Sequence, residues 1–162
     1  MPPKDPKGFI LVIDDDPLLR KTLKKILEKE GFMVDLATDG YEGIRKAKSG
    51  FFHLVLCDIR MPGLDGLMTL EHIRKFQDRA GAGASGFIVI TAYDSPDSRQ
   101  QAFRLGVSDF MMKPFDLEAF LASIRSQAAE ALKRTPLDEV QDLNRRLERL
   151  LALEKQPPTT LG

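Results

Sequence analysis

The sequence has a single cysteine, no excess of charge of either sign and no long hydrophobic run, and each shortage excludes a class of protein. Cys57 alone, among 162 residues, cannot form a disulfide within the chain, which excludes a disulfide-stapled secreted domain and favours a reducing compartment. Lysine and arginine together number 24, as do aspartate and glutamate, so the net charge indicates neither a nucleic-acid-binding surface nor an acidic tail.

The apolar stretches are also too short to cross a membrane. All fall far below the ~20 residues that span a bilayer, and the N-terminal MPPKDPKG has no signal-peptide core. We therefore expect a cytoplasmic protein that binds no membrane and, through this segment, no nucleic acid. The length suits one domain with an appendage.

Short apolar runs alternate with helical patterns along most of the chain. Strands are predicted over 9–13, 32–37, 53–58, 87–91 and 108–112, and helices over 17–30, 41–50, 67–76, 96–105 and from 116 onward, with a small-residue loop over 77–86. Strands that are apolar along their whole length are covered on both faces, which indicates a parallel sheet flanked by helices. The prediction is an α/β fold with a doubly wound five-stranded parallel sheet, flavodoxin-like if the strand order is 2-1-3-4-5.

Polar residues gather at the strand ends where doubly wound folds bind their ligands. Asp14 and Asp15 follow the first strand, Asp58 ends the third, Thr91 ends the fourth and Lys113 follows the fifth. Any one acid could merely cap a helix, but the five residues together predict a site. Three carboxylates and one ammonium leave a charge of about −2, which Mg²⁺ would neutralise because it prefers carboxylate and phosphate oxygens.

An aspartate in such a site can also act as a nucleophile and accept a phosphoryl group as an acyl phosphate. A metal and an ammonium would stabilise the added charge, and a hydroxyl could donate a hydrogen bond to it. Lys113 and Thr91 are placed for those roles. Zinc is not indicated, because His53 and His72 are expected at the surface or at an element boundary and Cys57 in the core.

Four motifs make the sequence resemble the receiver domain of response regulators, the phosphoacceptor half of two-component signalling. They are ILVIDDDP (10–17), LVLCDIRMPGLDG (54–66), VITAYD (89–94) and GVSDFMMKPF (106–115), and the resemblance, which is to chemotaxis-type receivers, covers residues 8–130. It implies that Asp58 is the phosphoacceptor and that Asp14 and Asp15 form the acidic pair. It also implies that Thr91 is the switch hydroxyl and that Lys113 bonds the phosphoryl group.

The same resemblance implies the metal ligands and the partner. Asp15, Asp58 and the backbone carbonyl of Arg60 would bind Mg²⁺ directly, with Asp14 acting largely through water. The phosphoryl donor would be a sensor histidine kinase or a histidine phosphotransfer domain. Phosphorylation would switch the face formed by the last two strands and the helices that follow the fourth and fifth strands. Such a module is a signalling switch that catalyses only its own phosphotransfer and slow dephosphorylation, not a turnover enzyme.

Further positions follow from the resemblance. Phe110 matches the switch aromatic, which is tyrosine in many family members, with core packing as the alternative. Lys113–Pro114 matches a cis peptide bond. Arg60 and Tyr93 stand at two positions that affect the life of the phosphoryl group, and their bulk suggests slow loss. Asp16, directly before Pro17, is expected to cap the first helix instead of binding metal.

Two other functions stay open. The D-x-D of Asp14–Asp15–Asp16 is similar to that of haloacid-dehalogenase phosphatases, in which Asp14 would be the nucleophile, although Leu18 stands where that family has Thr or Val. The other alternative is a degenerate receiver that serves only as a binding platform.

The C-terminal segment is expected to form a separate helix. Pro136 predicts a break, or a kink in one continuous helix, followed by a helix to about Lys155. Leu137, Val140, Asn144, Leu147 and Leu151 have heptad spacing, with Asn144 at an a position. We expect a helix that dimerises or transmits the signal, with packing on its own receiver as the alternative; a homodimer could also use the switch face.

The expected organisation is a tail over 1–7, a receiver over 8–134, a linker helix over 135–155 and a flexible end over 156–162. The linker-like composition of that end suggests a longer protein with an output domain. Transcription, cyclic-dinucleotide chemistry and a second kinase are all compatible outputs.

Overall fold

The computed structural model describes residues 3, 5–81 and 83–155, so the predicted tail over 156–162 lies outside it. The strands are β1 (Phe9–Ile13), β2 (Met33–Ala37), β3 (Leu54–Cys57), β4 (Gly86–Thr91) and β5 (Val107–Met112); the helices are α1 (Pro17–Lys29), α2 (Gly40–Ser49), α3 (Gly66–Ala80), α4 (Pro96–Arg104), α5 (Leu117–Arg134) and α6 (Leu137–Lys155). Over the described residues, no helix combines the length and the apolar character needed to span a membrane.

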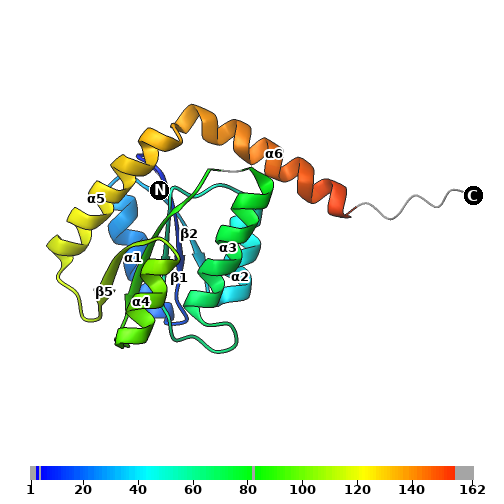
Figure 1. Ribbon diagram of the computed structural model, residues 1–162. Coiled ribbons are helices and arrows are strands. Elements are labelled where there is room, and N and C mark those ends of the chain that lie inside the picture. The colour runs from blue at the N-terminus through cyan, green and yellow to red at the C-terminus, as the bar shows by residue number, and fades with distance from the viewer. Residues whose placement is uncertain (1–2, 4, 82, 156–162) are drawn as a thin grey trace, which may run out of the picture.

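The five strands form one parallel sheet in the order β2-β1-β3-β4-β5, which confirms the predicted doubly wound, flavodoxin-like fold. Helices cover both faces of the sheet, and α6 crosses the end of the sheet near the N-terminus (Figure 1). The chain reverses direction in the sheet beside β1, because β2 lies on one side of it and β3 on the other. Ligands of such sheets bind at the carboxyl ends of the strands at this point.

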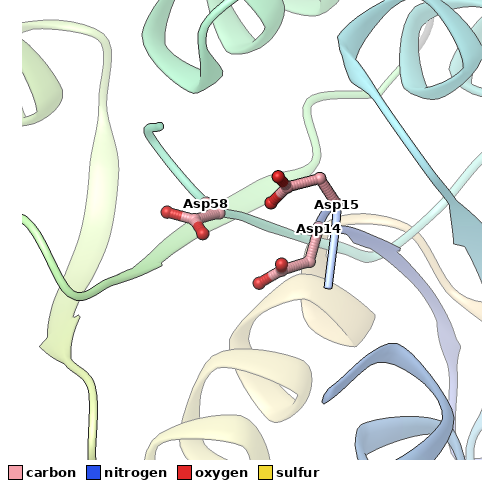
Figure 2. A group of neighbouring side chains, drawn as sticks. All are labelled: Asp14, Asp15 and Asp58. Carbon is pink, nitrogen blue, oxygen red and sulfur yellow. The ribbon is translucent and has the colours of Figure 1, made fainter. Parts of the chain in front are cut away.

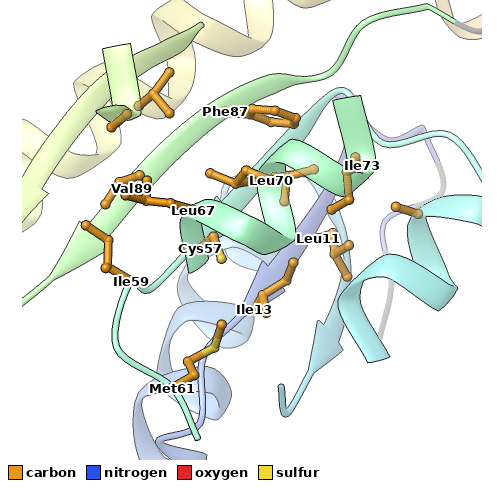
Figure 3. Close-up of a cluster of buried hydrophobic side chains, with 14 of the residues drawn as sticks. Leu11, Ile13, Cys57, Ile59, Met61, Leu67, Leu70, Ile73, Phe87 and Val89 are labelled. Carbon is orange, nitrogen blue, oxygen red and sulfur yellow. The ribbon is translucent and has the colours of Figure 1, made fainter. Parts of the chain in front are cut away.

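Alternate residues of the central strands enter two separate cores. Leu11, Ile13 and Cys57 face α2 and α3, where Leu70 and Ile73 of α3 pack against them (Figure 3). The intervening residues of the same strands face α1 and α5, in a second cluster with members that include Val12, Leu56, Leu23, Phe120 and Ile124. Burial on both faces explains why these strands read as unbroken apolar runs in the sequence.

Side-chain caps start the first five helices. The capping residues are Asp16, Asp39, Asp65, Ser95 and Asp116. Asp16 accepts hydrogen bonds from the N–H groups of Leu18 and Leu19, with Pro17 as the first helical residue. The prediction that Asp16 caps α1 is therefore confirmed, and the third acid of the DDD motif has a structural role.

The pairing of β4 with β5 contains an irregularity near its beginning. Phe87 pairs with Val107, but the next residue, Ile88, pairs with Asp109, so Ser108 is an extra residue on β5. From Asp109 the register is regular and pairs Thr91 with Met112. Lys113 follows directly, and its N–H donates to the Thr91 carbonyl.

The predicted end of the third helix was wrong. The segment 77–86 was expected to be a loop, but α3 continues to Ala80 and ends at Gly81, which has a left-handed φ of 63°. The extra turn is held by Gln77, which is buried and exchanges hydrogen bonds with the Ser85 hydroxyl and N–H. This partner lies eight residues ahead, outside the reach of a helical periodicity argument.

His53 stands at the boundary before β3, which is one of the two predicted placements, and its side chain is fully buried. Its Nδ1 accepts the Phe9 N–H at 3.1 Å, and its Nε2 lies 2.9 Å from the Thr135 carbonyl oxygen. Because Nδ1 accepts, the ring proton must be on Nε2, which donates to Thr135. The ring therefore ties β1 to the break between α5 and α6, which lies at Thr135–Pro136 as predicted.

Replacing His53 with Phe should lower the free energy of unfolding by about 2–3 kcal/mol, because two buried backbone groups lose their partner. Burial also lowers the pKa of His53, so the folded protein keeps the ring neutral where the unfolded chain takes up a proton. Wild-type stability should accordingly fall as the pH drops below 6.5, the ordinary histidine pKa, until the folded pKa is reached.

Urea denaturation over a pH series checks both effects, with His72→Ala, at an exposed position of α3, as the matched control. The control should change stability by less than about 0.5 kcal/mol. A His53→Phe variant as stable as this control would contradict the structural role of the ring.

Candidate functional site

Sheet register places the two buried acids side by side. Ile13 of β1 pairs with Cys57 of β3, and the next residues along these strands are Asp14 and Asp58. The Asp58 N–H donates to the Ile13 carbonyl, which continues the β1–β3 hydrogen bonding to the carboxyl ends of these strands. The Asp14 and Asp58 side chains are 3% and 7% exposed as residues, so both carboxylates are held away from bulk water.

Lys113 bridges these two carboxylates from the end of β5. Its Nζ lies 2.8 Å from Oδ2 of Asp14 and 2.8 Å from Oδ2 of Asp58. Burial raises the pKa of Asp14, and the contacts with Lys113 offset only part of that rise. Burial by itself lowers the pKa of Lys113, but its bonds to Asp14 and Asp58 outweigh this and raise the pKa above its ordinary value. The ammonium therefore stays charged at neutral pH.

Asp15 adds a third carboxylate, which is exposed. Oxygen atoms of Asp14, Asp15 and Asp58 all lie within 4.8 Å of one another, and Figure 2 shows the three carboxylates gathered beyond the ends of β1 and β3. Two carboxylates at this separation repel by about 3 kcal/mol at an effective dielectric of about 20. A set of three hard oxygen donors with one ammonium leaves negative charge uncompensated, which suits Mg²⁺.

The backbone around Asp58 is fixed by close packing. A Cβ atom on Gly66, the first residue of α3, would overlap the Asp58 carbonyl group, so only glycine fits there. The Gly66 N–H donates to the Ile59 carbonyl at 2.7 Å. Glycine at position 66 therefore lets α3 touch the backbone of Asp58.

Cys57 lies in the core, as predicted. The thiol is 1% exposed and contacts the Asp58 carbonyl oxygen at 3.3 Å. Burial, with added repulsion from Asp58 and Asp14, raises the pKa of this thiol well above its ordinary value. It therefore stays protonated and takes no part in metal binding or nucleophilic chemistry.

Thr91 is fully buried at the end of β4, on the same edge as the acids. Its Oγ1 accepts the Tyr93 N–H at 3.1 Å, which holds the start of the β4–α4 connection. The hydroxyl hydrogen has no such constraint and can be directed to an acceptor. Thr91 thus links the site edge to the segment that leads into α4.

The ring of Phe110 lies in the core cluster on the α2 and α3 side of the sheet, and the residue is 8% exposed. The guanidinium of Arg99, on α4, sits over this ring with its central carbon 4.7 Å from the centroid. Asp94 holds the same guanidinium through two hydrogen bonds of 3.0 and 3.3 Å. Phe110 thus packs in the core, and Arg99 lies against the ring.

Arg60 and Tyr93 meet above the site from two different connections. The Arg60 guanidinium stacks on the Tyr93 ring at 3.5 Å from its centroid. Both residues line a hollow of about 550 Å³ between the β3–α3 and β4–α4 connections. The Arg60 N–H donates to Asp58 Oδ1 at 3.3 Å, so this peptide group lies directly beside the predicted phosphoacceptor.

Sequence reasoning missed two arginines near these residues. Arg20, on α1, donates to the Asp14 carbonyl oxygen at 2.6 Å, and Arg99 covers Phe110. Each stands at a helical position that the sequence pattern assigns to the solvent-facing side, and no local pattern predicts its partner. All five predicted residues of the edge, Asp14, Asp15, Asp58, Thr91 and Lys113, are at the carboxyl ends of the strands as expected.

Comparison with known proteins gives one consistent family. A family model described as the response regulator receiver domain matches residues 10–125. The chain is 36% identical over 120 residues to the uncharacterized transcriptional regulatory protein YkoG of Bacillus subtilis, a match that covers 74% of this chain and 50% of that protein. It is 34% identical over 146 residues to the transcriptional activator protein PfeR of Pseudomonas aeruginosa, covering 90% of this chain and 45% of that protein. The chain thus spans about half the length of these curated relatives.

Solved structures agree with that match. A CheY-like receiver domain protein from Methanospirillum hungatei superposes with a TM-score of 0.71 at 31% identity, covering 77% of this chain and 96% of that one. The response regulator TrrA from Thermotoga maritima, solved in complex with Mg²⁺–BeF, superposes with a TM-score of 0.64 at 32% identity, covering 74% of this chain and 97% of that one.

Removing the bridging ammonium should destabilise the fold in a pH-dependent way. Lys113→Met leaves Asp14 and Asp58 buried without a cation, and breaking such a pair costs about 3 kcal/mol. The loss should be largest near pH 8 and shrink toward pH 5. Without Lys113 the pKa of Asp14 rises further, so this carboxyl takes up a proton on acidification and the repulsion is relieved.

Thermal or urea unfolding at the two pH values, without divalent metal, measures this difference. Lys133→Met is the matched control, because Lys133 pairs with Glu130 at the surface and its side chain is 73% exposed. An unfolding free energy for Lys113→Met that trails wild type by the same amount at both pH values would show that charge repulsion is not the cause.

Proposed function

The chain belongs to the response-regulator receiver family, and we propose that it is a switch in which Asp58 accepts a phosphoryl group from a histidine kinase or a histidine phosphotransfer domain. The observation that carries this proposal is the Asp14–Lys113–Asp58 group beside Asp15 at the carboxyl edge of the sheet. The pocket supplies a nucleophile, a metal site and an ammonium at one place. We expect the exchange with the kinase to take place in the cytoplasm.

A carboxylate oxygen of Asp58 would attack the phosphorus of the phosphohistidine. The P–N bond breaks, its electron pair returns to the imidazole, and an acyl phosphate forms on Asp58. Bound Mg²⁺ would supply charge stabilisation for the phosphoryl oxygens. Asp15, Asp58 and the carbonyl of Arg60 would hold the ion, with Asp14 acting largely through water.

Lys113 is within reach of the phosphoryl group because it already contacts Asp58. Its ammonium would exchange the carboxylate for a phosphoryl oxygen without leaving the pocket. The Thr91 hydroxyl, on the neighbouring strand, would donate to another phosphoryl oxygen. We propose that these two contacts carry the switch, since Thr91 also holds the Tyr93 N–H at the start of the β4–α4 connection.

The response would pass to the α4–β5–α5 face through Phe110. Movement of the β4–α4 connection would shift Asp94, which holds the guanidinium of Arg99 over the Phe110 ring. The ring carries no hydroxyl, so its response depends on packing and on this guanidinium. A population shift between two packings of this face would change its affinity for partners, including a second copy of the chain.

We propose a transcriptional output for the signal, because the relatives are transcriptional regulators by name. The chain covers only about half of those proteins. The output would therefore act through residues beyond the shared receiver, and this segment would make no direct contact with nucleic acid.

Incubation with acetyl phosphate and Mg²⁺ should add one phosphoryl group, and peptide mapping after borohydride reduction should place it on Asp58. Asp58→Asn should remain unlabelled, and Asp15→Asn should need far more Mg²⁺ for the same labelling. Label on Asp14 would support the phosphatase alternative. No label, with no binding of Mg²⁺ or beryllofluoride, would support a binding platform.

The phosphoryl group should be long-lived, because we expect the bulk of the stacked Arg60 and Tyr93 side chains to shield it from the attacking water. Tyr93→Ala should shorten the half-life of the phosphorylated protein several-fold in Mg²⁺, and Tyr41→Ala, at another exposed tyrosine, should leave it unchanged. Release of inorganic phosphate measures the rate. A wild-type half-life of seconds that does not change in Tyr93→Ala would remove the shielding role.

A further inference from the structure

Helix α6 packs back onto the receiver at the end of the sheet opposite the acidic site (Figure 1). Val140 and Leu143 are 1% and 7% exposed, and they form a small cluster with Phe51, against which the half-buried Phe9 packs. Phe51 lies between α2 and β3, and Phe9 opens β1. This contact buries Val140 and Leu143 in the first half of α6.

Two hydrogen bonds set the position of the helix. Asn144 Oδ1 accepts the Phe51 N–H at 2.6 Å, a bond between residues 93 positions apart. The Thr135 carbonyl, just before α6, binds His53 Nε2 at 2.9 Å. One anchor lies at the break before the helix and the other two turns into it, so together with the apolar cluster they fix its direction.

The residues that dock α6 are also residues of its heptad seam. Val140 and Asn144 occupy seam positions in the series 137, 140, 144, 147 and 151, and both are used within the chain. Leu137 is 37% exposed, and the side chains of Leu147 and Leu151 lie outside the described residues. A second α6 pairing through this seam would need Val140 and the Asn144 side chain to leave the receiver.

We propose that α6 has two mutually exclusive packings: docked on its own receiver in a monomer, or released and paired with the α6 of a second copy. The partner follows from the heptad spacing, because Val140 and Asn144 stand at positions that meet their equivalents in a parallel pair. Docking opposes dimerisation, since the apparent affinity falls with the fraction of released helix in each copy. This proposal concerns the α6 dimer and is independent of phosphorylation at Asp58.

A disulfide between positions 50 and 144 tests the proposal in one protein. A Cβ on Gly50 would lie 3.6 Å from Asn144 Oδ1, and the φ of Gly50 is an extended −166°, so cysteine fits. Gly50→Cys/Asn144→Cys should form an intrachain disulfide and be a monomer when oxidised. After reduction it should dimerise, because α6 is released and the Asn144 bond is gone. Light scattering in EDTA, without a phosphoryl donor, keeps the Asp58 switch out of the measurement.

The single variant Gly50→Cys is the matched control and should stay monomeric in both redox states, with Cys57 buried and unreactive. Failure to form the intrachain bond, or the same mass in the oxidised and reduced double variant, would each overturn the proposal.

A second experiment changes the receiver side and leaves the seam intact. Phe51→Ala should release α6, speed amide exchange around Val140 and tighten self-association by about tenfold or more. Adding Val140→Asp to that variant should restore the monomer, because a charge enters the seam. Phosphorylation of Asp58 in both variants reports that the receiver is folded. A folded Phe51→Ala protein with a released but monomeric α6 would refute the proposed pairing.

Discussion

The ammonium of Lys113 between Asp14 and Asp58 is the interaction on which the rest of the site depends. Parallel pairing extends β1 and β3 to the same edge, so two acids that follow their strands must meet there. Both are nearly buried, and without a cation their repulsion would oppose the register that brings them together. The strands bring Asp14 and Asp58 together, and the Lys113 ammonium offsets the repulsion between their carboxylates. Strand pairing and this ion-pair group therefore stabilise each other.

The fold and the edge of the site could be predicted from the sequence because both depend on local patterns. Apolar runs marked the strands, and each polar residue that followed one was placed by parallel pairing alone. The sequence did not reveal the partners in three contacts: Gln77 with Ser85, His53 with Thr135, and Asn144 with Phe51. The same residue types are found at heptad positions and at positions where a helix packs on its own domain. The spacing of Asn144 therefore could not show whether its side chain meets a second helix or the backbone of its own receiver.

The surroundings of Phe110 show the same limit in another form. The motif around Phe110 does not indicate which side chain lies against the outer face of its ring. The structure supplies a guanidinium from α4, fixed by Asp94 in the connection that Thr91 holds. The Arg99 guanidinium therefore lies against the Phe110 ring from a neighbouring helix. This contact between separate elements cannot be read from the residue at position 110 alone.

The extra residue Ser108 on β5 separates the two ends of that strand. From Asp109 to Met112, β5 pairs with β4 in a regular register, and this register sets the position of Lys113 beside the two acids. The extra residue lies before this regular stretch, at the start of β5. The bulge therefore lies between the connection from α4 and the residues that position the Lys113 ammonium. The spacing at the carboxyl ends of the strands is set by the regular pairing that follows it.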